Sequence, residues 1–281
     1  MIYCFDTSAI NRLLDDPESE PIIKTLLSVG SFRITAFNVI EAAKTPCKSR
    51  RHILIDLMKR LVVGKRPLDT PNSILRSYAK AHADGLRSAS VNADEDLDGL
   101  WIALNKSDLV NDDERQEVIE WVSKMEKDFS SVVAGDRDLF QTHFENAPHE
   151  RPTSIASTLR EYINRKNECK SLIGEIYKRQ TSRVLTDSGY SNLISESEWP
   201  LYFVGYAYAI HKRAIQAHRF QERRNPSAID LGQAIYLAMC DRFITNDQGQ
   251  YSALRLMNVL NKKRKTEVMK YSQFRDRLLA F

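Results

Sequence analysis

Two short apolar segments of the sequence each lead into an aspartate, and two further acidic residues lie between them in the chain. MIYCF leads into Asp6 near the N-terminus, and RFITN leads into Asp247 near the other end. Glu41 follows RITAFNVI, and Asp230 lies in the helix-start pattern NPSAIDLGQAIYLAM. If both segments are parallel strands, their carboxyl ends meet at one edge of a sheet, which is where open α/β sheets bind ligands. Four carboxylates in one cleft repel one another, so such a site requires protons or metal cations.

A set of ligands made of Asp and Glu, without thiolates or histidines, is typical of a site for a hard divalent cation. Mg²⁺ and Mn²⁺ prefer carboxylate and water ligands, and the six histidines show no spacing typical of zinc ligands. A bound divalent ion can deprotonate water and stabilise an in-line phosphoryl transition state. We therefore expect Mg²⁺ or Mn²⁺ as the cofactor. Four polar side chains beside the two strand ends can orient the carboxylates or contact phosphate: Thr7, Ser8, Thr245 and Asn246. Thr7 and Ser8 are equally suited to capping a helix.

Elements at both ends of the chain must position these acids. The first part is predicted to contain strand 2–6, a helix start at DTSAINRLL, helix 20–29, strand 32–36 and a helix from about Asn38. The last part is predicted to contain helix 228–240, strand 242–245, helix 249–261, strand 266–270 and helix 271–280. Strands that alternate with helices indicate βαβ units and a parallel sheet. Residues from about 50 to 225 have apolar positions at helical spacing, so we expect an α/β fold interrupted by a large helical insertion.

At this point the chain resembles the PIN-domain nucleases. FDTSAI, NVIEAA, AIDLGQAIYLA and FITNDQ look like the four acidic motifs of that family, in the family's order, and VMKYSQFRDRLL looks like its closing strand and helix. The resemblance covers about 1–48 and 226–281, and it does not cover the insertion 49–225. It implies a three-layer α/β/α domain and a metal-dependent nuclease, with Asp6, Glu41, Asp230 and Asp247 as catalytic and metal-binding residues.

The resemblance also implies a substrate and a biological setting. Most PIN domains cleave RNA, so the expected activity is endonucleolytic hydrolysis of RNA by a toxin or a phage-defence effector. Many members are the toxins of VapC-type pairs, so an antitoxin or another protein partner is expected. Those toxins are single short domains, whereas this chain carries a long insertion. The alternative is a catalytically inactive PIN-like scaffold whose helical insertion binds a protein partner. All four acids are present, and an inactive site has no reason to keep carboxylates that repel one another.

The charges of the chain are unevenly distributed, although the formal net charge is only +4. Segment 44–66 holds eight basic residues and one acidic residue, and further basic clusters lie at 212–224 and 262–265. Segment 94–128 holds twelve acidic residues and four basic ones, and we expect it to face away from a polyanion. Basic stretches beside a carboxylate cluster suit a nucleic acid that is cut at a metal site. We expect Lys44, Arg50 and Arg51 to bind the RNA backbone.

Three other enzyme classes are excluded by missing motifs. A haloacid-dehalogenase-type phosphatase needs a second aspartate two residues after the first, where this chain has Ser8. A glycine-rich dinucleotide fingerprint after the first strand is absent, and Gly64 and Lys65 have no upstream glycine at P-loop spacing. The chain has no apolar run long enough for a membrane span, no signal peptide is expected, and its four cysteines lack metal or disulfide spacing. These features favour a cytoplasmic protein without membrane contact.

Several other residues compete for a role at the site. Asp15 and Asp16 follow the first helix start and can solvate a loop, and Asp241 is expected at a helix end or in a loop. Tyr202, Phe203, Tyr206 and Tyr208 precede a basic run, which is a pattern of a base-stacking surface, but aromatic residues at helical spacing more often form a core.

Overall fold

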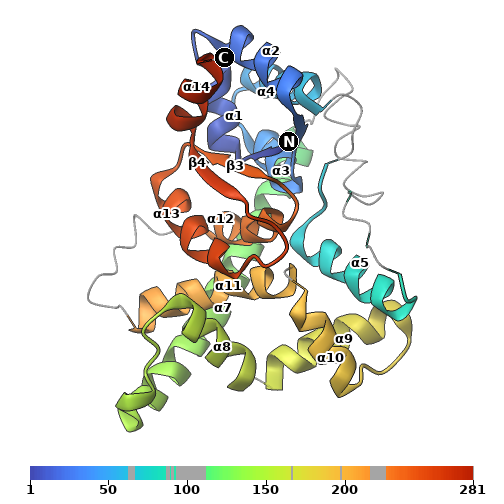
Figure 1. Ribbon diagram of the computed structural model, residues 1–281, viewed down its shortest axis with the longest axis vertical. Helices are drawn as coiled ribbons and strands as arrows, with labels where there is room; N and C mark the ends of the chain where they lie inside the picture. The colour runs from blue at the N-terminus through green and yellow to red at the C-terminus, as the bar shows by residue number, and fades with distance from the viewer. Residues whose placement is uncertain are drawn as a thin grey trace.

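The computed structural model describes residues 1–62, 67–86, 89, 92, 112–165, 167–196, 198–215 and 226–280 (Figure 1). In these residues, four parallel strands form one sheet in the order β2-β1-β3-β4. The strands are β1 (Ile2–Phe5), β2 (Ser31–Arg33), β3 (Arg242–Thr245) and β4 (Glu267–Lys270).

The longer helices of the first part are α1 (Thr7–Leu14), α2 (Ser19–Val29), α3 (Ala36–Lys44), α4 (Lys48–Val62) and α5 (Pro71–Ala83). Those of the middle are α7 (Asp112–Asn146), α8 (Ile155–Arg165), α9 (Asn167–Thr181), α10 (Asp187–Ser195) and α11 (Glu198–Ile210), followed by a π-helix (His211–Ile215). The last part contains α12 (Ala228–Gly232), a 3-10 helix η5 (Gln233–Ala238), α13 (Gln248–Met257) and α14 (Tyr271–Leu279).

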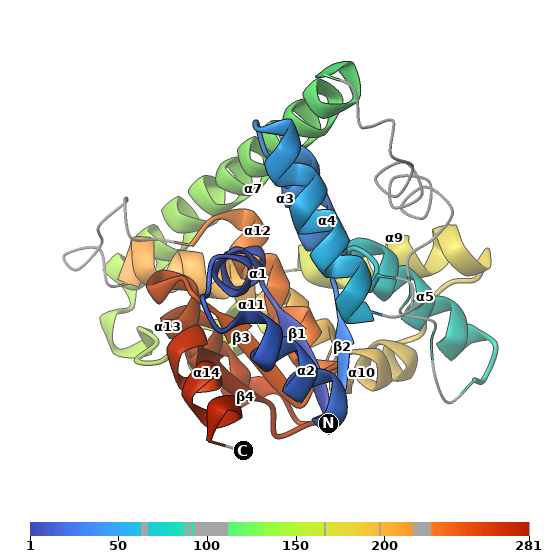
Figure 2. The same ribbon diagram turned by 90° about the horizontal axis from the view of Figure 1, so that it is seen from above.

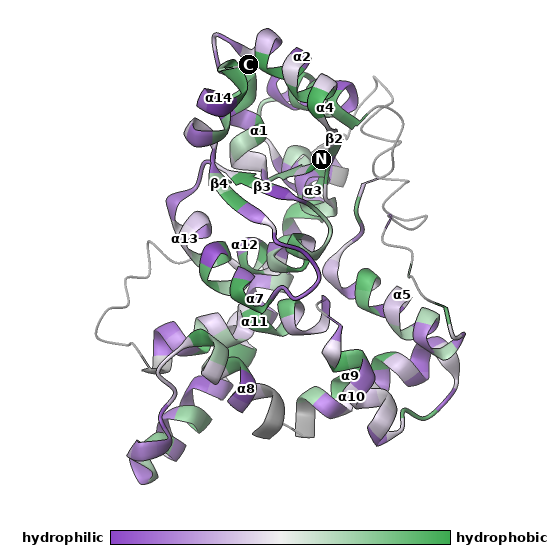
Figure 3. Cartoon of the chain, viewed as in Figure 1, coloured by the Kyte–Doolittle hydropathy of each residue, from purple (hydrophilic) through white to green (hydrophobic). Residues whose placement is uncertain are grey.

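Alternate residues of the strands enter two different hydrophobic clusters, as the pleat of a strand requires. Phe5 points into a cluster with α1, α2, α4 and α14, where its ring lies 4.8 Å from Phe32 and 4.9 Å from Phe274, edge to face. Cys4 and Phe243 belong to the other cluster. Helices therefore cover both faces of the sheet, and the expected mixed α/β fold with a parallel sheet is confirmed. Hydrophilic residues colour much of the outer helices α8 and α14 (Figure 3).

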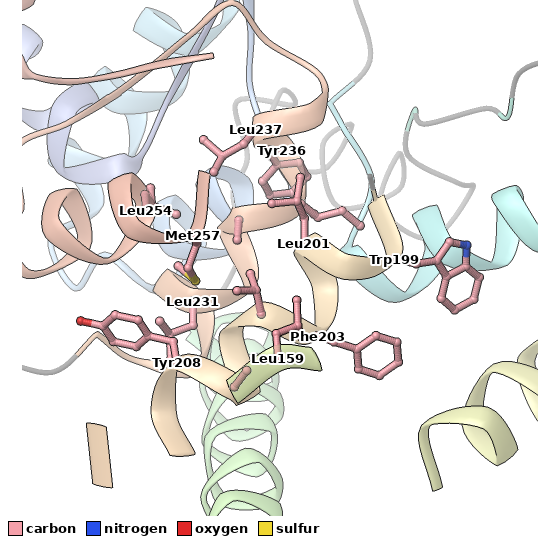
Figure 4. Packing of buried hydrophobic residues seen from close by; sticks show 14 of the residues in the cluster. Leu159, Trp199, Leu201, Phe203, Tyr208, Leu231, Tyr236, Leu237, Leu254 and Met257 are labelled. Atoms are coloured by element: carbon pink, nitrogen blue, oxygen red, sulfur yellow. The ribbon is translucent and has the colours of Figure 1, made fainter. Parts of the chain in front are cut away.

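The second cluster extends from the sheet into the middle of the chain. α13 lies directly against β3 and β4, and α11 packs against α13, η5 and α8. Figure 4 shows this core, in which Phe203 and Leu159 of the helical part lie near Leu231, with Tyr236 and Leu254 on the side of the sheet. The middle of the chain and the sheet thus share one continuous core.

The strand order reverses between β1 and β3, and this reversal positions the site. The chain runs from β1 through α1 and α2 to β2 on one side, and from β3 through α13 to β4 on the other, with these helices on opposite faces. The helices that follow β1 and β3 therefore diverge. In open α/β sheets, ligands bind at such a switch point, outside the carboxyl ends of the strands.

The element boundaries agree closely with the sequence-based predictions, and two of the differences have a clear local cause. The predicted strand 32–36 ends at Arg33, because Thr35 and Asn38 form a reciprocal capping box that begins α3 at Ala36. The predicted helix 228–240 changes to a 3-10 helix after Gly232. Glycine has a low helix propensity, and a Cβ at this position would lie 3.2 Å from the ring of Phe37.

Helix α4 begins at the end of the sequence that resembles a PIN domain, yet it packs on the sheet. It contacts β2, and Leu54 and Met58 are fully buried in the cluster with α1. Leu68 continues this arrangement with a parallel bridge to Thr35, in which its N–H donates to the Ile34 carbonyl at 2.8 Å. None of the helices in the described part of the chain is both long and apolar enough to cross a membrane.

Candidate functional site

Asp6 is the buried centre of the candidate site. It follows β1 and caps α1, because its Oδ1 accepts a hydrogen bond from the Ala9 N–H at 2.7 Å. Its Oδ2 accepts from the Thr245 hydroxyl, at the end of β3, at 2.7 Å. The Ser8 hydroxyl lies within 2.9 Å of both carboxylate oxygens. Asp6 therefore joins the carboxyl ends of the two strands at the switch point.

Burial makes the charge of Asp6 costly. The side chain is 3% exposed, and desolvation raises its pKa to about 7, although the hydrogen bonds from Thr245, Ala9 and Ser8 oppose this shift. The negative charge of Glu41 raises the pKa of Asp6 further. A carboxyl group in this state is close to half protonated at neutral pH unless a cation neutralises it.

Glu41 comes from α3, which the Thr35–Asn38 capping box positions against α1. The Asn38 side-chain amide donates to the Thr7 hydroxyl at 3.2 Å, and Thr7 in turn hydrogen-bonds Glu41. Burial raises the pKa of Glu41, and the charge of Asp230 adds to the effect, whereas Lys44 lowers it. Glu41 is thus the link between Asp6 and the acids on the other side of the site.

Asp230 lies at the third position of α12, where it completes a second capping box. Its Oδ2 accepts from the Ser227 N–H at 2.9 Å and from the Ser227 hydroxyl at 3.0 Å. Burial raises the pKa of Asp230, and the charges of Asp247 and Glu126 add to this. Asp230, from the segment after 226, therefore lies near the negative charges of Glu41 and Glu126, which come from the N-terminal half of the chain.

Asp247 is the most exposed of the four acids. It caps α13, since its Oδ1 accepts from the Gln250 N–H at 2.6 Å. Its own N–H donates to the Thr245 hydroxyl at 2.9 Å, and the Asn246 N–H donates to the Ser8 hydroxyl at 2.9 Å. Thr245 and Ser8 therefore connect the turn after β3 to Asp6 and to α1.

The four predicted acids come from four separate segments and act on one another electrostatically. The charge of Glu41 affects Asp6, that of Asp230 affects Glu41, and that of Asp247 affects Asp230. Within the described part of the chain, no basic side chain forms an ion pair with any of them. Among the described residues, no three His, Cys, Asp or Glu side chains form a group that could hold a metal ion as they stand.

The basic residues expected to bind substrate have different environments. Lys44 is half-buried and close enough to lower the pKa of Glu41. Arg50 forms a bidentate ion pair with Asp15, with N–O distances of 2.6 and 2.8 Å. Arg51 is only 4% exposed and donates to the Thr45 carbonyl at the end of α3, at 2.7 Å. Of the three, Lys44 is the one positioned beside the acids. Segment 212–224 lies outside the described residues from 216 onward.

Three competing aspartates lie away from the four acids and have basic partners. Asp15 pairs with Arg50, and Asp16 accepts from Tyr271 and Arg275 at 3.0 Å each. Asp241 accepts from the Ile2 N–H at 2.7 Å, which places it at the opposite, amino-terminal edge of the sheet.

Sequence reasoning missed Glu126, which belongs to the acidic segment expected to face away from the site. Glu126 is on α7, and its carboxylate accepts from the N–H groups of Ala228 and Ile229, at 3.0 and 3.4 Å. It therefore caps α12 from outside and adds a fifth negative charge near Asp230. The sequence contains no local signal for this contact, because 102 positions separate Glu126 from Ala228. Residues 94–111 of the same segment lie outside the described part of the chain.

Comparisons with protein-family models, with curated proteins and with solved structures found no match to this chain.

Proposed function

We propose that the chain is a PIN-like, metal-dependent endoribonuclease with a three-layer α/β/α domain. The observation that supports this most directly is the mutual electrostatic effect of four acids from separate segments, at the switch point of a parallel sheet. Structural carboxylates elsewhere in the described chain, such as Asp15 and Asp16, have arginine partners. Repulsion among acids that have no such partner within the described residues is a stability cost that a cation site explains.

The donor chemistry of the site fits Mg²⁺ or Mn²⁺. All the acidic donors are carboxylates, which are the ligands that these ions prefer. Asp6, Glu41, Asp230 and Asp247 would hold the ion. The ion, when bound, supplies an activated water and stabilises negative charge on phosphoryl oxygens.

The chain's own groups have defined parts in this proposal. Thr245 and Ser8 fix the orientation of Asp6 by donating to its carboxylate. Lys44, beside Glu41, would bind a phosphate of the RNA backbone. Ser8 and Asn246 lie at the exposed side of Asp6, where a substrate phosphate would approach. Arg50 and Arg51 support the site indirectly, by holding α4 to α1 and to the end of α3.

The decisive experiment is cleavage of single-stranded RNA with Mn²⁺ or Mg²⁺ and with excess chelator. Cleavage should require the ion, and Asp6→Asn and Asp230→Asn should each lower kcat/KM at least ~100-fold, or about 2.7 kcal/mol in the barrier. Asp15→Asn is the matched control, because it removes a carboxylate of the same type at the other end of α1. It should change cleavage less than about twofold, since an exposed ion pair contributes only about 0–1 kcal/mol to stability. Full activity in either site variant would refute the proposal.

A further inference from the structure

A pocket of about 380 Å³ opens between the sheet domain and the helical part of the chain, against helices that carry Glu41 and Asp230. It lies among α11, α7 and α12, with the start of α5 at its rim. Its volume is within the usual range of small-molecule sites. Two glycines let the helices approach closely here. A Cβ at Gly205 would lie 3.2 Å from Leu231, and one at Gly232 would lie 3.2 Å from Phe37.

Three helices contribute both to this pocket and to the acidic site. On α3, Phe37 lines the pocket and Glu41 follows it by four residues, which places both on one face of the helix. On α12, Leu231 lines the pocket directly after Asp230. On α7, Met125 lines the pocket directly before Glu126. The pocket is therefore lined by the helices that carry Glu41, Asp230 and Glu126, and Glu126 accepts from the N–H of Ala228, which itself lines the pocket.

Aromatic rings form much of the pocket wall. Phe129 and Tyr206 lie 4.9 Å apart between ring centroids, and Tyr202 lies 6.1 Å from Tyr206. Trp121, one turn before Met125 on α7, is 45% exposed although it lines the pocket. A large indole left this open to solvent beside other rings is a surface on which a flat molecule can stack.

Polar groups of both kinds stand at the rim. Asn72 accepts from the Tyr202 hydroxyl through Oδ1 at 2.7 Å, so this hydrogen bond leaves its amide N–H groups as donors. Lys124 supplies further donors, and the Asp128 carboxylate is an acceptor. Apolar ring faces with donors and acceptors at the edge match the chemistry of a nucleobase, which stacks through its faces and hydrogen-bonds through its edge.

We propose that this pocket binds one base of single-stranded RNA while the adjoining backbone crosses the four acids. The inference rests on the proposed function for the identity of the substrate. It adds that the helical part of the chain takes part in substrate recognition, through α7 and α11. Recognition of this kind requires an unpaired base, so the substrate is single-stranded rather than double-stranded.

The test measures affinity in the presence of chelator, so that no cleavage contributes. A labelled pentaadenylate and an abasic pentamer with the same backbone are titrated by fluorescence anisotropy. The wild type should bind the pentaadenylate more tightly than the abasic pentamer. Trp121→Ala should weaken pentaadenylate binding about tenfold and leave binding of the abasic pentamer unchanged. Val132→Trp, which fills the pocket from α7 without removing a core contact, should have the same selective effect.

Leu139→Ala is the matched control, because Leu139 is on α7, is 62% exposed and does not line the pocket. It should bind both oligomers as the wild type does. The inference is overturned if the wild type binds both oligomers equally or binds neither, or if both pocket variants bind pentaadenylate as Leu139→Ala does.

The cleavage assay separates this inference from the proposed function. If the wild type cleaves RNA in an Asp230-dependent manner while the pocket variants keep full affinity, only the pocket inference fails. If the pocket variants lose affinity selectively while Asp230→Asn has no effect on cleavage, the nuclease assignment fails and base binding stands.

Discussion

The two ends of helix α1 contain aspartates with opposite electrostatic properties. At its N-terminus, Asp6 is buried next to other acids, and its pKa is raised to about 7. At its C-terminus, the hydrogen bond and charge of Arg50 lower the pKa of Asp15. Burial acts against the charge of Asp16, yet Glu18, Tyr271 and Arg275 together bring its pKa below the usual value. The same residue type, within ten positions, therefore has an unfavourable charge at one end and a stabilised charge at the other.

The difference lies in what the fold brings to each carboxylate. Asp15 and Asp16 receive arginines from α4 and α14, which tie those helices to α1 and its following turn (Figure 2). Asp6 receives hydroxyl groups and the negative charge of Glu41. The first arrangement stabilises the folded chain by itself, whereas the second becomes stable only with protons or a cation.

The largest expected effect is a pH dependence that only the Asp6 end shows. The folded-state pKa of about 7 exceeds the ordinary value of 3.8, so the unfolded chain ionises first as the pH rises. The stability of the wild type relative to Asp6→Asn should therefore fall between about pH 4 and 7 in metal-free buffer, by roughly 4 kcal/mol in all. Denaturant unfolding at several pH values measures this difference.

Asp16→Asn is the control for the pH experiment. Because the folded-state pKa of Asp16 lies below the ordinary value, its stabilisation is complete above that value and is lost only at lower pH. The difference between the wild type and Asp16→Asn should stay constant between pH 4.5 and 7. Parallel curves for the two variants would contradict the contrast between the ends of α1.

A somewhat smaller effect is expected from added metal. A cation that binds only the folded state stabilises it by about 2.7 kcal/mol at a hundredfold excess over its Kd. The Tm should rise with millimolar Mn²⁺ at pH 7.5, and it should rise less at pH 5.5, because protons compete for the same carboxylates. The rise should shrink in Asp6→Asn and persist in Asp16→Asn. An equal rise in both variants would mean that the cation binds elsewhere.

The smallest expected effect concerns Glu126, which adds charge to the site from α7. Glu126→Gln keeps an acceptor for the Ala228 N–H and removes one negative charge near Asp230. We expect a loss of at most about 1 kcal/mol of stability and a change in cleavage rate of about threefold. Glu117→Gln, an exposed change on the same helix, should alter neither. A loss comparable to that of Asp230→Asn would make Glu126 a ligand rather than a cap.

Local patterns in the sequence determined the strands and much of the site. IYCF and RFIT are short, largely apolar runs, and an aspartate that caps the next helix follows each within two residues, so short-range rules alone place Asp6 and Asp247 at strand ends. Strand–helix alternation is sufficient to indicate a parallel sheet, and hence to bring those ends to one edge. Asp230 lies in the first turn of α12 and Glu41 in the second turn of α3, and the capping boxes of Ser227 and Thr35 fix those two helix starts locally.

Only the tertiary structure decided which charges lie near which. Arg51 and Lys44 belong to one basic segment, yet one is buried under the end of α3 and the other stands beside Glu41. Glu126 and the aromatic residues of α11 meet α12 through long-range packing that no local pattern encodes. A residue's type and spacing fix its chemistry and its element, whereas its desolvation and its neighbours depend on how the elements pack. The raised pKa of Asp6 and the pocket among α7, α11 and α12 are properties of that packing.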